Sequence, residues 1–308
     1  MQTPETVILL ATYNGERFLH QQIQSLAVQT VDRVHVYVSD DGSTDSTRDI
    51  LTSWKRRWRK GEFEILKGPN RGFAANFQSL VVRVKRAGDF FAFCDQDDVW
   101  DVDKLERAIV RIKEERASVP ILYCSKTRNV DQSGKLIGSS RRFRTTPSFR
   151  NALVQSVASG NTMVMNDSAW AVLASSCRRT DFVAHDWWSY LIVSGAGGRI
   201  IYSSVPSLSY RQHETNAIGS SQGWKDRLRR FRSLTSGEYK RFTTKNLASL
   251  NQCLDLLTPQ NRCALRKFEM IRSPKLITRL EALRASGVYR QAFFGQITLY
   301  AASVFKWI

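Results

Sequence analysis

Three acidic residues stand within four positions directly after a short apolar segment of this 308-residue chain. The segment is residues 90–94, and Asp95, Asp97 and Asp98 follow it. An unbroken aromatic run of this length is typical of a strand that is buried on both faces. Ligands of open α/β sheets bind at the carboxyl ends of strands, and grouped carboxylates can hold a hard divalent cation with positions left for phosphate. The spacing predicts such a cation site, with a solvated acidic turn as the alternative.

A second candidate for chemistry is Asp186, in the first turn of a helix expected over residues 184–195. The positive end of a helix favours an ionised carboxylate. Such a carboxylate can cap the backbone of that turn, or it can act as a general base toward an attacking hydroxyl. The adjacent Trp187 and Trp188 favour the base, since aromatic faces are common platforms for sugar rings. His185 is expected either to orient this site or to be packed in the core.

A third candidate is His213, which follows the sequence Tyr-Arg-Gln. A neutral imidazole suits divalent transition ions, and it can equally donate a hydrogen bond to a diphosphate. On the residues alone, both roles stay open beside the simpler one of an ordinary surface or core histidine.

The elements that must position these residues alternate between strand and helix. Four apolar segments, separated by amphipathic helical segments, are expected to form strands: residues 6–11, 34–38, 62–66 and 90–94. The alternation predicts an α/β fold with a doubly wound, mostly parallel sheet flanked by helices. Right-handed crossovers place successive strand ends along one edge of the sheet. That edge would gather the acids after residue 94 with four earlier polar residues, Asn14, Glu16, Asp40 and Asp41.

The glycine-rich loops that usually bind nucleotides do not occur in the chain. Neither G-x-G-x-x-G nor G-x-x-x-x-G-K-[ST] is present. This disfavours a dinucleotide-binding Rossmann site and a P-loop. A nucleotide at this site would be read by carboxylates and a metal.

The composition is that of a globular protein, 42% hydrophobic and 24% charged, but the net charge is +18. Residues 219–308 hold 17 Lys and Arg against 5 Asp and Glu, which gives +12 of that charge. Such a segment should meet an anionic membrane surface or nucleic acid, unless its charges are merely solvated. The five cysteines form no C-x-x-C pair, which favours reduced thiols in the cytosol. Neither a signal peptide nor a membrane-spanning helix is expected.

The C-terminal part is expected to form basic amphipathic helices. Two apolar faces have helical spacing: Leu228, Phe231 and Leu234, then Leu247, Leu250, Leu254 and Leu257. Four aromatic residues near the end are candidates for anchors that dip into a membrane: Phe293, Phe294, Phe305 and Trp307. The alternative is that these helices only pack against the rest of the chain.

Six sequence blocks resemble the family 2 glycosyltransferases of the glycosyltransferase-A fold, especially a rhamnosyltransferase-like bacterial branch. The blocks lie in the family's order within about residues 5–219: residues 10–19, 39–45, 94–100, 159–162, 185–188 and 210–213 with Asn216. The combination of Asp-Gln-Asp-Asp-x-Trp with His-Asp-Trp-Trp is specific, whereas Asp-Asp-Gly-Ser alone is weak. The last 90 residues match no family pattern.

The resemblance implies a metal-dependent transfer of a sugar from a nucleoside diphosphate to an acceptor hydroxyl. Asp186 is the implied base, and Asp95, Asp97 and His213 are the implied ligands of Mg²⁺ or Mn²⁺. Contacts with the nucleotide sugar are expected for nine residues: Thr12, Tyr13, Asn14, Glu16, Asp40, Asp41, Arg71, Asp95 and Gln96. The platform for the acceptor or sugar is expected at Trp187, Trp188 and His185. One base without a second nucleophilic carboxylate implies a single displacement, hence inversion.

The expected donor is dTDP-rhamnose, and the expected acceptor is a glycan or lipid-linked glycan of cell-surface polysaccharide or lipopolysaccharide assembly. The expected location is cytoplasmic, at the inner face of the plasma membrane, without nucleic acid. The alternative is a basic membrane- or nucleic-acid-binding protein without transferase activity. A nucleotidyltransferase is less favoured, since it would be expected to carry a glycine- and lysine-rich triphosphate loop.

The expected domain division follows from these blocks. Residues 1–218 form the catalytic domain, with a nucleotide-binding half at 1–100 and an acceptor-binding half at 101–218. Residues 219–308 form the basic helical extension.

Overall fold

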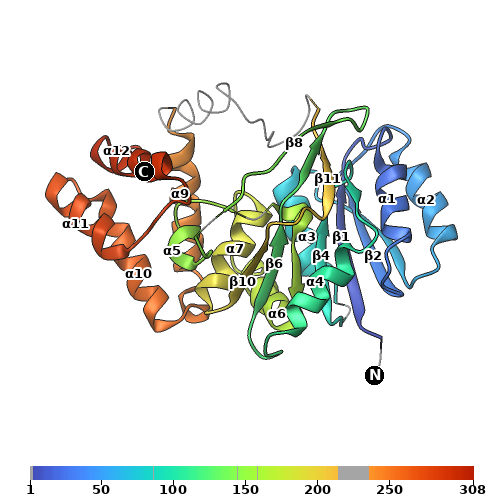
Figure 1. Cartoon of the computed structure of the whole chain (residues 1–308), viewed down its shortest axis with the longest axis horizontal. Helices are drawn as coiled ribbons and strands as arrows, with labels where there is room; N and C mark the ends of the chain where they lie inside the picture. Colours follow the sequence, from blue (N-terminus) through green and yellow to red (C-terminus); the bar gives the residue numbers. More distant parts are fainter. Residues whose placement is uncertain (1–2, 86, 144, 158, 214–235) are drawn as a thin grey trace.

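A seven-stranded sheet forms the centre of the molecule (Figure 1). The computed structural model of the chain describes residues 3–85, 87–143, 145–157, 159–213 and 236–308. The strands, in sheet order, are β10 (Arg199–Ser203), β6 (Ile121–Ser125), β9 (Val164–Asn166), β4 (Phe90–Cys94), β1 (Glu5–Thr12), β2 (Arg33–Asp40) and β3 (Phe63–Lys67). All pairings are parallel except those of β9, which runs antiparallel to β4 and β6. The mostly parallel α/β sheet predicted from the sequence is confirmed.

Helices cover both faces of this sheet, because its central strands are apolar on both sides. Side chains alternate along β1, so that Val7 and Leu9 enter one buried cluster while Ile8 and Leu10 enter the other. The helices of the sheet-forming part are α1 (Leu19–Ala27), α2 (Thr47–Arg57), α3 (Phe73–Arg83), α4 (Lys104–Lys113), α5 (Phe149–Ala152), α6 (Asp167–Cys177) and α7 (His185–Gly195). The neighbouring strands β1, β2 and β4 end at one edge, as predicted.

A second, smaller sheet stands beside that edge and was not predicted. Its strands, in order, are β5 (Val99–Trp100), β11 (Leu208–Arg211), β7 (Arg128–Val130) and β8 (Leu136–Ser139). Strands of two to four residues are too short to show a period of two in the sequence. The pairing of β11 with β5, in the register Leu208 with Trp100, carries the residues after β11 to the acidic loop that follows β4.

The C-terminal helices pack against the rest of the chain. They are α9 (Glu238–Asn251), α10 (Pro259–Glu269), α11 (Leu276–Ser286) and α12 (Phe293–Val304). Leu247, Leu250 and Leu257 are buried in the same core cluster as Trp188 of α7, so this predicted apolar face faces the protein interior. The other predicted face, Leu228, Phe231 and Leu234, lies outside the described residues, as does Asn216.

Within the described ranges, no helix combines the length and the apolar character needed to cross a bilayer. The five cysteines are all free thiols, four of them buried and Cys263 exposed.

Candidate functional site

The loops that follow β1 and β2 are tied together by hydrogen bonds. Thr44 N donates to Asn14 Oδ1 at 2.9 Å, and Ser46 N donates to Glu16 Oε2 at 3.0 Å. Asn14 has φ 46°, in the left-handed region that asparagine tolerates better than most residues. Asn14 and Glu16 therefore shape the sheet edge where the predicted nucleotide site lies. Their contact with a nucleotide stays a prediction.

Asp40, at the end of β2, is a buried structural acceptor. Its carboxylate accepts a hydrogen bond from Ser43 N at 3.0 Å and another from Arg48 Nε at 2.7 Å. Burial alone would raise the pKa of Asp40, but the hydrogen bonds from Ser43 and Arg48 outweigh it and lower that pKa. Asp40 is therefore ionised at neutral pH and holds the loop after β2.

Asp41 performs a similar task for the loop after β3. Its Oδ1 accepts from Asn70 N at 2.6 Å, and its Oδ2 accepts from Gly72 N at 2.8 Å. Gly72 has φ 83°, which favours glycine, and it is the N-cap residue that directly precedes α3. Arg71 lies between these two anchored residues and is exposed at the edge of the site. Asp41 thus fixes the backbone from which Arg71 projects.

Gln96 links the ends of β1 and β4. Its Oε1 accepts from Thr12 Oγ1 at 2.7 Å and from Tyr13 N at 2.9 Å, while its Nε2 donates to Tyr13 O at 3.1 Å. These three hydrogen bonds hold the loop after β1 against the loop after β4. Tyr13, whose side chain is 54% exposed, is available to a ligand at this edge.

The acidic loop after β4 is anchored through its last carboxylate. Asp98 is fully buried and accepts hydrogen bonds from Asn161 Nδ2 and from Arg211 N. Arg211 also donates from Nε to Asp97 O at 3.0 Å. Burial, followed by the charges of Asp97 and Asp95, raises the pKa of Asp98 well above its ordinary value. Asp98 therefore holds the loop and is not free to bind a ligand.

Asp95 lies among other carboxylates. Desolvation is the main cause that raises its pKa to about 7, and the charges of Asp97 and Asp186 add to it. The two predicted centres, the acidic loop and the start of α7, are thus close enough to interact electrostatically. Such crowding of negative charge is relieved when a cation enters.

Asp97 and His213, which were predicted as ligands of the same metal ion, are in direct contact. His213 Nε2 lies 2.6 Å from Asp97 Oδ2, and the imidazole stacks on Phe18 with ring centroids 5.6 Å apart. Arg211 covers the same Phe18 ring, with its guanidinium carbon 4.4 Å from the centroid. The small sheet therefore delivers an imidazole to the acidic loop.

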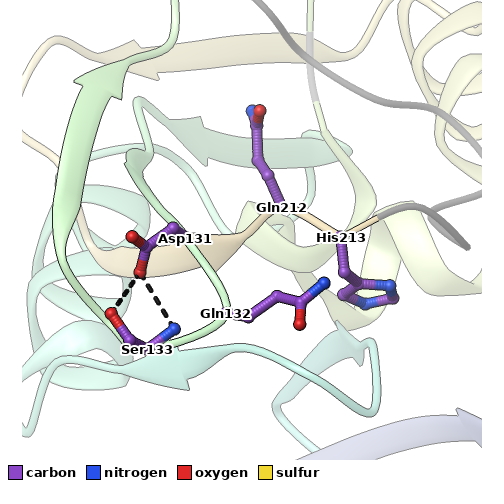
Figure 2. Close-up of a pocket in the computed structure, with 5 residues that line it drawn as sticks. All are labelled: Asp131, Gln132, Ser133, Gln212 and His213. Carbon is purple, nitrogen blue, oxygen red and sulfur yellow. Dashed lines mark hydrogen bonds between the residues drawn. The ribbon is translucent and has the colours of Figure 1, made fainter.

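An open cavity of about 590 Å³ lies next to this pair (Figure 2). It is lined by Asp131, Gln132, Ser133, Gln212 and His213. Figure 2 shows the Gln132 amide directed toward the His213 ring, while Asp131 accepts hydrogen bonds from Ser133. The cavity offers amide and hydroxyl groups and the carboxylate of Asp131 beside an imidazole, which suits a polar ligand.

Asp186 stands in the first turn of α7, as predicted. Its Oδ1 accepts from Trp187 N at 2.6 Å, and the backbone of Gly160 also stabilises the carboxylate. Burial outweighs these hydrogen bonds and raises the pKa of Asp186 to about 6. A carboxylate with this pKa is ionised at neutral pH and is a stronger base than an ordinary aspartate.

Two of the three predicted platform residues are in the core. Trp188 is fully buried, stacks on Phe182 and donates from Nε1 to Ser176 Oγ at 3.0 Å, so the prediction of a sugar platform at Trp188 is wrong. His185 is 6% exposed and stacks on Phe77 with centroids 3.7 Å apart. The alternative that His185 is packed in the core is therefore confirmed. Because the ring is buried, the prediction of a platform at His185 is wrong.

Trp187 remains partly exposed. Its Nε1 donates to Ala152 O at 2.7 Å, which fixes the indole against α5. Its role as a platform stays a prediction.

The residues fit a divalent cation in part. Across the described ranges, no three histidine, cysteine, aspartate or glutamate side chains converge to hold a metal ion. Asp97 and His213 do meet, with Asp95 near enough to feel the charge of Asp97. Mg²⁺ is usually bound by one or two carboxylates together with substrate phosphates. The arrangement suits a cation that completes its coordination with a diphosphate.

Three residues of this site were given no role by sequence reasoning. Asn161 and Arg211 hold Asp98 and Asp97, and Lys104 lies fully buried with Nζ 3.5 Å from the centroid of Trp100. Burial lowers the pKa of Lys104 to about 7. Asn161 and Arg211 stand inside the recognised blocks, so the blocks were the available signal. Nothing in the sequence distinguishes Lys104 from a surface lysine.

Comparison with protein families and curated proteins gives concordant matches. The model described as "Glycosyl transferase family 2" matches residues 7–173, more than half of the chain. The dTDP-rhamnosyl transferase RfbG of Shigella flexneri is 26% identical over 246 residues, which cover 77% of this chain and 82% of that protein. The putative glycosyltransferase EpsH of Bacillus subtilis is 27% identical over 139 residues, which cover 45% of this chain and 38% of EpsH.

Solved structures are similar in fold. TarS of S. aureus, residues 1–349 in complex with UDP-GlcNAc, matches with a TM-score of 0.57 at 16% identity and covers 98% of this chain and 91% of that one. The mannosyltransferase PcManGT from Pyrobaculum calidifontis, in complex with GDP-Man and Mn²⁺, matches with a TM-score of 0.54 at 15% identity, covering 100% and 82%. These likenesses bear on the fold and confirm the glycosyltransferase-A fold expected from the sequence.

Proposed function

The chain belongs to glycosyl transferase family 2, and we propose that it transfers a sugar from a nucleoside diphosphate to an acceptor hydroxyl with inversion. The observation that carries this proposal is the position of Asp186. Its partly buried carboxylate, with a pKa raised to about 6, lies within electrostatic reach of Asp95 in the acidic loop. A base and a phosphate-binding centre are the two parts that such a transfer needs.

In the proposed reaction Asp186 takes the proton from the acceptor hydroxyl as that oxygen attacks the anomeric carbon. The backbone N–H of Trp187, which donates to Oδ1, holds the carboxylate in place during this step. In the described part of the chain, Asp98 is held by Asn161 and Arg211, and Asp97 contacts His213, while Asp95 is assigned to the cation in this proposal. One base without a free nucleophilic carboxylate supports a single displacement.

Asp97 and His213, with Asp95, would hold Mg²⁺ or Mn²⁺. When bound, the cation neutralises charge on the departing nucleoside diphosphate. Asp98 does not touch the ligand in this proposal but positions the loop. The imidazole stacked on Phe18 keeps His213 beside Asp97.

The nucleotide would lie along the edge formed by the ends of β1, β2 and β4. Tyr13 and Arg71 are exposed there and would contact the base or the phosphates directly. Six further residues frame the same edge through the loop hydrogen bonds described above: Thr12, Asn14, Glu16, Asp40, Asp41 and Gln96. The cavity beside His213 would take the sugar or the acceptor.

We further propose dTDP-rhamnose as donor, supported by the 26% identity to a protein named dTDP-rhamnosyl transferase. The acceptor would be a glycan or lipid-linked glycan of surface polysaccharide assembly, met by the cytoplasmic protein at the inner face of the plasma membrane. Residues 1–100 would bind the nucleotide, residues 101–218 the acceptor, and residues 219–308 the membrane.

A nucleotide-release assay over a panel of sugar nucleotides, with and without Mn²⁺ or Mg²⁺ and without acceptor, tests the proposal. Slow, metal-dependent hydrolysis of one donor is expected and would name the sugar. Absence of both hydrolysis and metal-dependent nucleotide binding would overturn it. The basic binding protein without transferase activity would then be the better interpretation.

A further inference from the structure

The last helix of the chain exposes an apolar stripe. Four large apolar side chains recur at helical spacing along α12 and are exposed: Phe293 (77%), Ile297 (50%), Tyr300 (41%) and Val304 (38%). Residues three and four apart stand on the same side of a helix, so these four form one row. Phe294 and Phe305, exposed by 76% and 61%, widen the row at its two ends. We name these six side chains the α12 face.

The opposite side of α12 packs against the protein core. Leu299, Ala302 and Ser303 are buried, and Leu299 and Ala302 belong to the main core cluster. The orientation of the helix is therefore fixed by its own core contacts. The exposure of the α12 face is a property of the folded protein and does not come from a loosely attached segment.

Arg279 of α11 holds the end of α12 in place. Its buried guanidinium donates from Nε to Ser303 O at 2.8 Å and from Nη2 to Val304 O at 3.0 Å. The same group donates from Nη1 to Pro274 O at 2.9 Å, just before α11 begins. Two further apolar residues, Leu276 and Ile277, are exposed in the first turn of the same helix α11.

The part of the chain that carries this surface is positively charged. Residues 236–308 hold 12 Lys and Arg against 4 Asp and Glu, a net charge of +8. Lys275 and Lys306 are exposed, and each directly neighbours an exposed apolar residue, Leu276 and Phe305 respectively. Exposed phenylalanine and tyrosine within a basic surface are typical of proteins that lie on an anionic bilayer.

We propose that the α12 face docks on an anionic phospholipid surface, with the aromatic side chains among the headgroups and the lysines on their phosphates. A second copy of this chain fits the face less well, because pairing would bring two segments of charge +8 together. The proposal rests on the proposed function only for the location of the acceptor.

Flotation of the full chain with lipid vesicles tests the docking. One vesicle type is phosphatidylcholine alone, and the other holds equal parts of phosphatidylcholine and phosphatidylglycerol. The chain is expected to float with the anionic vesicles, and less so at high salt. Phe293→Ser with Phe294→Ser should lower the partition about tenfold or more, since two apolar side chains no longer leave water. Both are exposed in the folded protein, so the fold is expected to tolerate the change.

Matched controls separate docking from general effects. Leu136→Ser with Ile137→Ser changes an equally adjacent exposed apolar pair on β8 and should leave flotation unchanged. Lys275→Glu with Lys306→Glu should weaken binding to the anionic vesicles, whereas Lys113→Glu on the exposed side of α4 should not.

Equal flotation of the wild type and the Phe293→Ser/Phe294→Ser variant would overturn the proposal. A concentration-dependent dimer in sedimentation that the same variant abolishes would also overturn it in favour of a second copy. Nucleotide release without acceptor is measured on each preparation. Lost release with retained flotation would count against the transferase, and retained release without flotation would count against the docking.

Discussion

The His185 ring lies against Gly160 so closely that a Cβ atom at position 160 would be 2.1 Å from Nε2 of the imidazole. The ring has little freedom to withdraw. It stacks on Phe77 with centroids 3.7 Å apart and meets the edge of Phe93 at 4.8 Å. Gly160 is thus required by the packing of a buried histidine. The same glycine supplies a backbone contact to the carboxylate of Asp186.

Gly160→Ala should therefore damage both stability and turnover. The added methyl group must displace the His185 ring, and overpacking of this kind costs about 1–3 kcal/mol in the free energy of unfolding. Turnover should fall as well, because the backbone contact to Asp186 and the Asn161 hydrogen bond to Asp98 come from the same loop. Urea unfolding and the nucleotide-release assay measure the two effects.

The double variant Gly160→Ala with His185→Ala is the control for that mechanism. Removal of the ring removes the clash, so the two changes should be less harmful together than the sum of the single changes. Strictly additive losses would show that the alanine acts through some other contact.

The burial of His185 also predicts a pH dependence of stability. Burial lowers its pKa to about 3 from an ordinary value of 6.5, and its ring nitrogens have no hydrogen-bond partner among the described residues. Between pH 6.5 and pH 3 this residue is therefore protonated in the unfolded chain but neutral in the folded chain. The contribution is complete above pH 6.5 and is lost progressively as the pH falls toward 3, by about 2 kcal/mol between pH 7 and pH 5.

Comparison with His185→Phe isolates this contribution. Asp95 and Asp186 have raised pKa values, about 7 and about 6, and act in the opposite direction in both proteins. As the pH falls, the unfolding free energy of the wild type should therefore decrease relative to that of His185→Phe. Parallel stability curves would mean that the imidazole is accessible to protons in the folded state.

The sequence was sufficient for the architecture of the sheet and for the gathering of its strand ends. Long apolar runs such as residues 6–11 and 90–94 carry strong local signals, and parallel topology follows from their alternation with helices. The acids after β4 were placed at that edge by the same reasoning. Asp186 was assigned from its helix position, the adjacent tryptophans and the family resemblance, and its role as base stays a prediction. Its charge contributes to the raised pKa of Asp95, so the two carboxylates lie close to each other.

The burial of Trp188 has a physical reason that could have been inferred from the sequence of α7. Residues 188–195 of α7 are all buried, so the helix is enclosed on every side rather than amphipathic. A helix that is apolar all round is a core helix. The Trp-Trp pair suggested a surface because it was interpreted by residue type instead of by the composition of the whole helix.

The contacts of Asp98 show what local pattern cannot supply. Its partners Asn161 and Arg211 lie 63 and 113 positions away in the chain. Asn161 stands just before β9, which runs antiparallel to β4 in the main sheet. Arg211 ends β11, which belongs to the small sheet of very short strands. Neither feature has a periodic signal, so the support of the acidic loop emerges only from the tertiary structure.

Asp97→Ala is expected to weaken metal-dependent nucleotide binding by at least about tenfold, since it removes a proposed ligand and the contact of that ligand with His213. Calorimetric titration with a nucleoside diphosphate, with and without Mn²⁺, measures the effect. His213→Ala should cause a similar loss, and the double variant should lose little more.

Asp32→Ala serves as the matched control, because Asp32 is an exposed acid outside the site. It should bind nucleotide as the wild type does. Unchanged Mn²⁺ dependence in Asp97→Ala would remove Asp97 from the proposed metal site.

Asp186→Asn tests the base itself. Transfer should fall by about 10²–10⁴-fold, the usual contribution of general base catalysis, while nucleotide binding remains. The amide keeps the size of the side chain and its hydrogen bond from Trp187 N, so the helix should be undisturbed. Asp181→Asn, at an exposed acid shortly before α7, is the control and should leave transfer unchanged.

The pH profile gives an independent reading of the same residue. Since the base must be ionised and burial raises the pKa of Asp186 to about 6, kcat/KM should be constant above that pH and decline as the pH falls through it. The decline approaches about tenfold per pH unit when one proton blocks the reaction. Asp186→Asn should lose this limb from its residual activity. A retained limb, or near-normal turnover, would show that another group accepts the proton of the acceptor hydroxyl.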